Sequence, residues 1–200
     1  MEVIEKNIKF KGANMDKKSL IYKHATELIA RHGFENTTIQ MIADAGEISV
    51  GTVYNYFNNK EAILEYIFQV EYKKREAILK EISEGDVPIE TKIRKIVDFQ
   101  LSELEKNASV VRTIVKESMT KYFYEIEWIQ KSVNLIKDAF IKMLAKAKIN
   151  GEIRDLDEAI VSSLIYFSGY HLAWMNEDKE EDFRKTKEEV FDFIVNGIKK

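Results

Sequence analysis

The chain has 200 residues, a formal net charge of −3 at pH 7, no cysteine, one proline and eight glycines. The absence of cysteine excludes a disulfide framework and a thiolate metal site, and the slightly acidic balance is not that of a protein wrapped in nucleic acid. No apolar run is long enough to span a bilayer and no signal peptide opens the chain, so we expect a soluble, cytoplasmic protein with no membrane partner. Proline and glycine, which interrupt helices, are few, and Lys, Glu, Ile and Leu are abundant, so the composition predicts an all-α fold.

The first fifteen residues are irregular, and we expect 1–15 to form a flexible N-terminal extension, with Met15 as an alternative start. A basic arm that reaches DNA through Lys6, Lys9 and Lys11 is the other interpretation. A first helix is then predicted from about Asp16 to His32, closed by a glycine at position 33.

Two short helices joined by a tight turn are predicted in the next stretch. Thr37 and Gln40 have the spacing of a capping box, and the helix that they open runs to Ala45. The turn at 46–48 ends it, and Ser49 is placed to cap a second helix that runs to Phe57. Two helices of this length around such a turn match the helix-turn-helix, whose second helix enters the DNA major groove.

The second helix is expected to bury Val53 and Phe57 and to leave its polar side outside. Hydroxyl and amide side chains of this kind bond to phosphate oxygens and base edges. The outward residues are Ser49, Thr52, Tyr54, Asn55 and Tyr56. A polar helical hairpin that touches only water is the alternative.

These residues resemble the TetR (tetracycline-repressor) family of bacterial transcription regulators. The matching positions are Thr37-Thr38, Ile42-Ala43, Ser49, Gly51-Thr52, Tyr54, Tyr56-Phe57 and Lys60-Glu61. One departure lies in the turn, where Gly46-Glu47 replaces the usual Ala-Gly and brings a carboxylate near the phosphates. The resemblance implies an all-helical homodimer that binds a palindromic double-stranded DNA operator and releases it when a small molecule binds.

The resemblance also implies individual DNA-binding roles. Base edges would be met by Gln40, Val50, Gly51, Thr52 and Tyr54, and phosphates would be held by Thr38, Ser49, Asn55, Tyr56 and Lys60. Gln40 cannot cap its own helix and read a base at the same time. Basic and acidic residues balance over 16–60, so we expect modest affinity from one copy, with dimerisation supplying much of the rest.

The remaining chain is predicted to be helical throughout, which gives about nine helices in total. The later helices are expected at about 59–84, 89–106, 109–121, 124–148, 156–177 and 182–199. The expected organisation is a three-helix DNA-binding domain with a helix-turn-helix at 16–76, followed by a helical effector-binding and dimerisation bundle at 77–200.

Residues 160–175 are apolar nearly all round, so their helix is expected to be buried on more than one side. We assign its small-residue face to a partner subunit and its aromatic face, with Phe167, to the core. The last helix would complete a four-helix dimer interface. The expected interface residues are Ser162, Tyr166, Gly169, Ala173, Phe191, Ile194 and Ile198. A buried helix of a monomer is the alternative.

Aromatic residues gather in the second half of the chain. Most of them are expected to be packing, yet helical bundles also place ligand pockets between their helices. The resemblance assigns the effector site to this part. The candidate effector-binding residues are Phe99, Met119, Phe123, Trp128, Phe140, Tyr166, Tyr170, His171 and Trp174, with His171 or Tyr170 as polar anchor. The stretch from Ala173 faintly resembles family members that respond to long-chain acyl-CoA.

Catalysis, a metal site and a cofactor are not expected. The three histidines are scattered, and neither a metalloprotease motif nor a phosphate-binding glycine loop is present. The leading hypothesis is a ligand-responsive repressor and not an enzyme. The alternative from another functional class is a helical small-molecule carrier or enzyme with an inert hairpin. An activator or a ligand-free architectural DNA-binding protein is an intermediate hypothesis.

Overall fold

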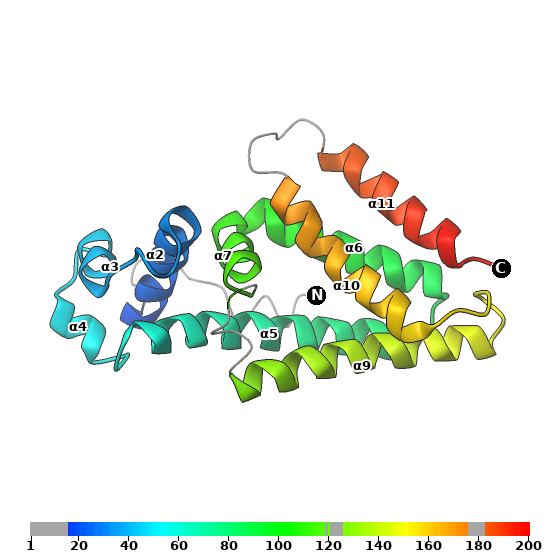
Figure 1. The fold of residues 1–200 in the computed structure, drawn as a ribbon, viewed down its shortest axis with the longest axis horizontal. Helices are drawn as coiled ribbons and strands as arrows, with labels where there is room; N and C mark the ends of the chain where they lie inside the picture. Colours follow the sequence, from blue (N-terminus) through cyan, green and yellow to red (C-terminus); the bar gives the residue numbers. More distant parts are fainter. Residues whose placement is uncertain (1–15, 119, 121–125, 176–182) are drawn as a thin grey trace. The chain divides into compact units, whose positions relative to one another are not determined.

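The computed structural model describes residues 16–118, 120, 126–175 and 183–200, with side chains omitted at 169–175, 183, 184, 186 and 187 (Figure 1). Every regular element in these residues is an α-helix, apart from an isolated antiparallel bridge between Ile153 and Lys199. The all-α prediction is confirmed. The chain divides into two compact units, Met1–Ile67 and Phe68–Lys200, so the division falls inside helix α5 (Lys60–Glu84). The functional boundary expected at 76 remains a prediction.

The first unit contains α2 (Lys17–His32), α3 (Ile39–Ala45), α4 (Val50–Tyr54) and the beginning of α5. Asp16 caps α2 by accepting a hydrogen bond from the amide of Lys18. Gly33 closes the helix at φ 83°, a left-handed conformation that glycine adopts without a steric penalty. The helices meet in a small apolar core. Its fully buried members are Ile21, Ala25, Ile29, Ile42, Ala43, Val53, Ile63, Leu64 and Ile67.

The capping box predicted at the start of α3 was wrong by one residue. Thr38 is the cap, since its Oγ1 accepts from the amide of Met41 at 3.1 Å. Thr37 is buried and donates its hydroxyl to the carbonyl of Gly33, while the Gln40 amide donates to Asp44 at 2.7 Å. Thr37 therefore joins the end of α2 to α3, and Gln40 takes no part in the cap.

Helix α4 ends at Tyr54, earlier than the predicted Phe57. Asn55 is its C-cap, and the following residues continue as turns in which Tyr56 and Phe57 both donate to the carbonyl of Val53 at 3.0 Å. The side chain of Phe57 nevertheless reaches the core, where it is 5% exposed. The burial expected for this residue is thus correct although the regular helix stops before it.

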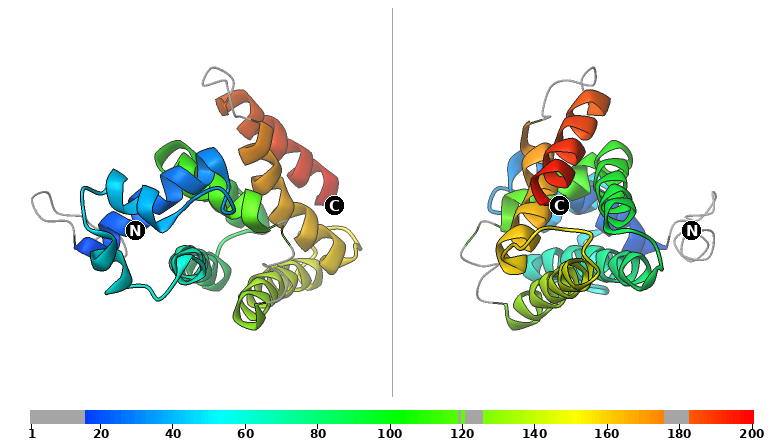
Figure 2. Two further views of the ribbon diagram at one scale, coloured as in Figure 1. Left: turned by 60° about the vertical axis from the view of Figure 1, so that its left-hand side comes forward. Right: turned by 90° about the vertical axis from the view of Figure 1, so that its right-hand side faces the viewer.

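The second unit contains the rest of α5 and five further helices. These are α6 (Ile89–Lys106), α7 (Ala108–Ser118), α9 (Glu127–Ile149), α10 (Glu158–Met175) and α11 (Phe183–Ile198). Helix α10 packs against α9, α7 and α6, and α11 packs against α6. Figures 1 and 2 show α10 and α11 side by side. Asn150 and Gly151 end α9 as predicted, with Gly151 at φ 74°.

Glu152 ties the α9–α10 connection to the beginning of α6. Its Oε2 accepts from the amide of Ile89 at 2.7 Å, and its Oε1 accepts from the Asn150 side chain at 3.1 Å. The hydrogen bond from the Ile89 amide is the main cause that lowers the pKa of the Glu152 carboxyl in the folded chain. A carboxylate at a helix N-terminus is also favoured by the helix dipole.

This carboxyl makes the stability of the second unit pH-dependent. A lowered folded-state pKa means that the ionised group stabilises the fold above its unfolded pKa, near 4.5, and that this contribution is lost as the pH falls through the folded value. Glu152→Gln is expected to lower the free energy of unfolding at pH 7 and to flatten its dependence between about pH 5 and 3. Urea denaturation across this range measures it, with exposed Glu105→Gln on α6 as control. Parallel pH profiles for wild type and Glu152→Gln would contradict this assignment.

Candidate functional site

The turn between α3 and α4 fixes the start of α4. The amide of Ile48 donates to the carbonyl of Ala43 at 3.0 Å, and that of Glu47 donates to Asp44 at 3.1 Å. This is the Schellman pattern of a helix end, in which the residue after the cap takes a left-handed conformation. That residue is Glu47 at φ 50°, a non-glycine in a position that favours glycine.

The strain and the charge of Glu47 can be separated by two substitutions. Glu47→Gly is expected to raise the free energy of unfolding of the first unit by up to about 1 kcal/mol. The steric free-energy cost of holding a residue with a side chain in the left-handed conformation exceeds the conformational-entropy cost of ordering a glycine there. Glu47→Gln keeps the strain and removes the charge, so it should leave stability unchanged. Both should strengthen non-specific DNA binding at low salt. Chemical denaturation and DNA titration check these outcomes, and equal stability of the two variants would contradict the strain argument.

Helix α4 begins with a fully formed cap. The Ser49 hydroxyl oxygen accepts from the amide of Thr52 at 3.0 Å and lies 2.9 Å from the Thr52 hydroxyl. The cap predicted at Ser49 is confirmed. It holds two hydroxyls together at the exposed beginning of the helix, where polar groups of this type can meet phosphate oxygens or base edges.

The two sides of α4 differ as the sequence predicted. Val53 is fully buried, while Tyr54 is 52% exposed and Tyr56 is 43% exposed. The remaining residues assigned to DNA are exposed or partly exposed. They are Thr38, Gln40, Ser49, Val50, Gly51, Thr52, Asn55 and Lys60. The structure therefore leaves these mainly uncharged residues on the outside of this unit, and DNA contact by them remains a prediction.

Lys60 has an internal role in the described residues. Its Nζ donates to the carbonyls of Phe34 at 2.8 Å and Glu35 at 3.2 Å, and it lies 4.3 Å from the centre of the Phe34 ring. These contacts join the beginning of α5 to the α2–α3 connection. Phosphate binding by Lys60 remains a prediction, and it would require the ammonium group to leave or share these partners.

A second lysine of this unit also lies against aromatic rings. Nζ of Lys18 is 4.0 Å from the centre of the Tyr66 ring and 5.5 Å from that of Phe57. Burial and the nearby charge of Asp16 raise the pKa of the Tyr66 hydroxyl. With Lys18 and Lys60 engaged in this way, the exposed lysine and arginine residues of 16–67 are Lys17, Lys23 and Arg31, so uncharged donors would supply part of any contact with a DNA backbone.

A mainly apolar cavity of about 70 Å³ lies within the second unit. Its walls are helix stripes with the i, i+3, i+4, i+7 spacing that places side chains on one face. The stripes come from α5 and α6, with shorter contributions from α7, α9 and α10. The lining residues are Arg75, Ile78, Leu79 and Ile82; Ile96, Phe99, Gln100 and Glu103; Val111, Ile114 and Val115; Ile136 and Phe140; and Tyr166.

The candidate effector residues divide into three groups. Phe99, Phe140 and Tyr166 line the cavity. Trp128 does not line it, because its ring packs edge-on against Tyr72 at 6.5 Å. The side chains of Met119, Phe123, Tyr170, His171 and Trp174 lie outside the described residues. The α5 wall was missed, although the apolar residues at 78, 79 and 82 carry the helical spacing that could have indicated it.

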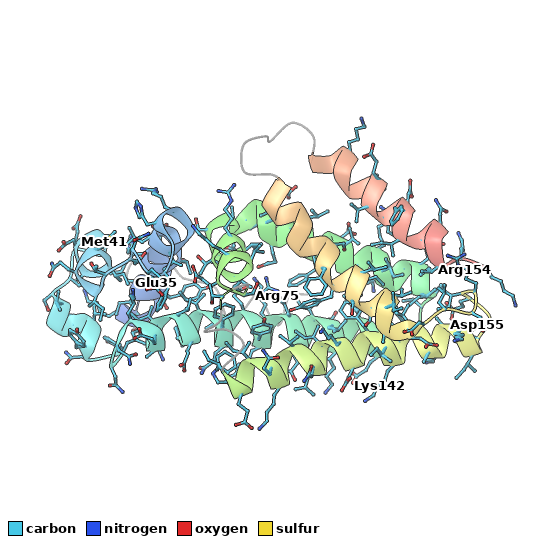
Figure 3. All side chains as sticks on the ribbon, in the orientation of Figure 1. Glu35, Met41, Arg75, Lys142, Arg154 and Asp155 are labelled. Carbon is cyan, nitrogen blue, oxygen red and sulfur yellow. The ribbon has the colours of Figure 1, made fainter. Side chains whose placement is uncertain are left out.

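One end of the cavity is polar and its charges are paired. The buried Glu103 carboxylate forms an ion pair with Lys74, and Nη1 of Arg75 donates to Oε2 of Glu71 at 2.7 Å. Figure 3 labels Arg75, which lies on α5. Among the residues that the structure describes, no group of three or more histidine, aspartate or glutamate side chains could hold a metal ion.

Comparison with known proteins identifies the first unit. Residues 21–67 match the family model described as bacterial regulatory proteins, tetR family. The chain is a member of the TetR family. The match covers most of α2, the helix-turn-helix and the beginning of α5, which are the elements that position the exposed surface of α4. Within the described ranges, no helix of this TetR protein is long and apolar enough to cross a membrane.

Similarity to individual proteins extends over the second unit. The fatty acid metabolism regulator protein of Bacillus subtilis is 24% identical over 180 residues, which are 87% of this chain and 91% of that protein. The regulator YhgD of the same organism is 27% identical, but the match spans 52% of this chain and 54% of YhgD. These relatives are transcriptional regulators and not enzymes, in agreement with the expectation from the sequence.

Solved structures share the fold of the whole TetR chain. FadR of Bacillus halodurans has a TM-score of 0.80 at 21% identity and covers 92% of this chain and 97% of its own. FadR of Bacillus subtilis in complex with stearoyl-CoA has a TM-score of 0.77 at 21% identity, with 90% and 98% covered. At these identities the likeness supports the fold alone.

The exposed apolar face of α10 differs from the face expected at a subunit seam. Ser162 is 1% exposed and Tyr166 is 6% exposed, because α9, α7 and α6 pack on their side of the helix. Phe167, expected in the core, is 48% exposed, so that assignment was wrong. Large apolar side chains are exposed instead at Ile160, Leu164 and Phe167, which lie on one stripe.

Helix α11 shows the same reversal. The expected interface residues Phe191, Ile194 and Ile198 are buried within the protomer, and Arg94 lies 3.4 Å from the centre of the Phe191 ring. Phe193, on the other side of the helix, is 80% exposed. For Gly169 and Ala173 the structure describes the backbone only. The available apolar surface of these two helices therefore lies on the faces turned away from the protomer's core.

Proposed function

We propose that this TetR-family regulator is a repressor that binds a palindromic operator as a homodimer and is released by a small, largely apolar effector. It would act in the cytoplasm, on the chromosome. The observation that carries the proposal is the exposed polar side of α4, which includes Tyr54, on a helix whose other side is fixed in the core by Val53. Residues 16–76 would be the functional DNA-binding domain and 77–200 the effector and dimer domain.

The exposed faces of α10 and α11 support the homodimer. Ile160, Leu164, Phe167 and Phe193 are all about half exposed or more, and apolar side chains grouped in this way mark association surfaces. A second copy that packs the same two helices about a two-fold axis would bury them in an isologous interface. Two copies then offer two α4 helices to one duplex, which compensates for the small positive charge of each.

The cavity supports the effector. Its walls are mainly aliphatic, and a relative with the same fold binds stearoyl-CoA. Its volume of about 70 Å³ is well below the roughly 300 Å³ of a small ligand pocket, so an effector must displace some of its walls. One wall is α5, which continues from the cavity into the DNA-binding unit. Displacement of this wall would be the step that couples effector binding to operator release.

The test is a DNA-binding titration with the intergenic fragment beside the gene of this protein. Preferential, salt-dependent binding to that fragment over competitor DNA is expected, with release by aliphatic compounds that also raise the melting temperature. A helical small-molecule carrier with an inert hairpin would show the thermal shift without any DNA preference. That result would reject the repressor.

A further inference from the structure

Gln100 places a carboxamide oxygen without a described hydrogen-bond partner beside the cavity. It lies on the α6 stripe that lines the cavity, and its Oε1 is buried without a hydrogen-bond partner among the described residues. Buried polar side-chain atoms are nearly always paired, so an unpaired one calls for a specific explanation. A carboxamide offers both an acceptor oxygen and N–H donors. A group that both donates and accepts hydrogen bonds would satisfy it.

The two ends of the cavity differ in polarity. Helices α5 and α6 are joined by a short connection, and Nζ of Lys92 donates to the carbonyl of Ser83, which brings the beginning of α6 to the end of α5. Ile82 and Ile96 therefore lie toward the connection. At the other end of the two stripes, Glu103 pairs with Lys74. The cavity thus runs from an aliphatic end to a polar end, and Gln100 belongs to the polar end.

The polar end has little charge to offer a ligand. Each carboxylate has a cation beside it: Glu103 pairs with Lys74, and Glu71 pairs with Arg75. A ligand carboxylate buried here would lack a cation of its own, and a buried unpaired charge is strongly unfavourable. A neutral polar group has no such penalty, and Gln100 can pair with it directly.

We infer that the cavity binds an aliphatic ligand whose neutral head group, a hydroxyl or a primary amide, pairs with Gln100 while its chain extends toward Ile82 and Ile96. The inference rests on the proposed effector site and specifies the ligand class that this site prefers. Gln100 is then a specificity-determining residue. It accepts from the head group through Oε1 and can donate to it through Nε2.

Four eight-carbon probes test the inference on the full-length protein: 1-octanol, octanamide, methyl heptyl ether and octanoate. The ether only accepts hydrogen bonds, and octanoate is an anion. Calorimetric titration is expected to show that octanol and octanamide bind about tenfold more tightly than the ether, as one buried hydrogen bond allows. Octanoate is expected to bind more weakly than either of them.

Gln100→Leu should bring the affinities of octanol and the ether within about twofold of each other, because the leucine contacts only the chain. The same variant should melt at a higher temperature than wild type, since it removes a buried carboxamide oxygen that has no described partner. Gln130→Leu on α9 is the matched control, because Nε2 of Gln130 is also buried without a described partner but does not line the cavity. It should leave the probe preference intact.

The outcomes separate the inference from the proposed function. Equal affinity of the wild type for octanol, the ether and octanoate would overturn the role of Gln100 and leave the effector cavity standing. A lowered melting temperature of Gln100→Leu would also overturn it, because the amide would then be paired with a structural water. Failure of all four probes to bind would reject the effector cavity itself, together with the inference.

Discussion

Leu164→Glu is expected to separate the two protomers and to weaken binding to a palindromic operator by about 100-fold. In the dimer, binding of one protomer to its half-site raises the effective concentration of the other protomer at the second half-site, and separate protomers lose this advantage. Leu164 is 62% exposed in the protomer, so the substitution leaves the fold intact. In the dimer it would bury a charge in an apolar seam. Sedimentation velocity reports the change in mass, and fluorescence anisotropy reports operator affinity.

Leu135→Glu is the matched control for that experiment. Leu135 is 55% exposed on α9, which contributes no residue to the proposed seam, and the substitution introduces the same charge in the same unit. We expect it to remain a dimer with wild-type operator affinity. If Leu164→Glu remains a dimer as well, the exposed face of α10 is not the interface. If Leu135→Glu alone dissociates, the interface involves α9.

Tyr54→Ala is expected to remove most of the preference for operator over competitor DNA, a loss of about 10-fold to 100-fold, as expected for contacts to base edges. Tyr54 is 52% exposed and the α4 cap does not use it, so stability should change little. Thr52→Ala should act in the same direction, with a small loss of stability because its hydroxyl contacts Ser49. Competition binding at a fixed salt concentration measures both.

Asn36→Ala is the control for the substitutions in α4. Asn36 is exposed in the same unit, outside the helix-turn-helix, and its side chain donates only to the carbonyl of His32. Its replacement keeps the net charge and should keep the operator preference. An unchanged preference in Tyr54→Ala would show that the exposed side of α4 does not read the bases.

The helix-turn-helix was predictable because its signals are local. Hydroxyl caps and the apolar pair Val53 and Phe57 specify the α4 orientation without reference to any distant residue. The cap of α3 was less certain, since Thr37 and Thr38 are both good caps. Only the contact of Thr37 with Gly33, at the end of another helix, decides between them.

The orientation of α10 could not be predicted in the same way. Its sequence is apolar nearly all round, so periodicity does not distinguish one face from another. The packing of α9 and α7 against α10 determines which face is buried. It leaves Ser162 and Tyr166 buried and Phe167 exposed. The cavity was only partly predicted because aromatic residues form only part of its lining, whereas aliphatic and paired charged residues of α5 form one wall.

Selection of bound sequences from random double-stranded DNA, with the mass of the selected complex measured in solution, tests the central claim most directly. The account predicts enrichment of an inverted repeat bound by two copies of the chain, and loss of that enrichment in Tyr54→Ala. Recovery of random sequence, or of a site without two-fold symmetry bound by a single copy, would contradict it.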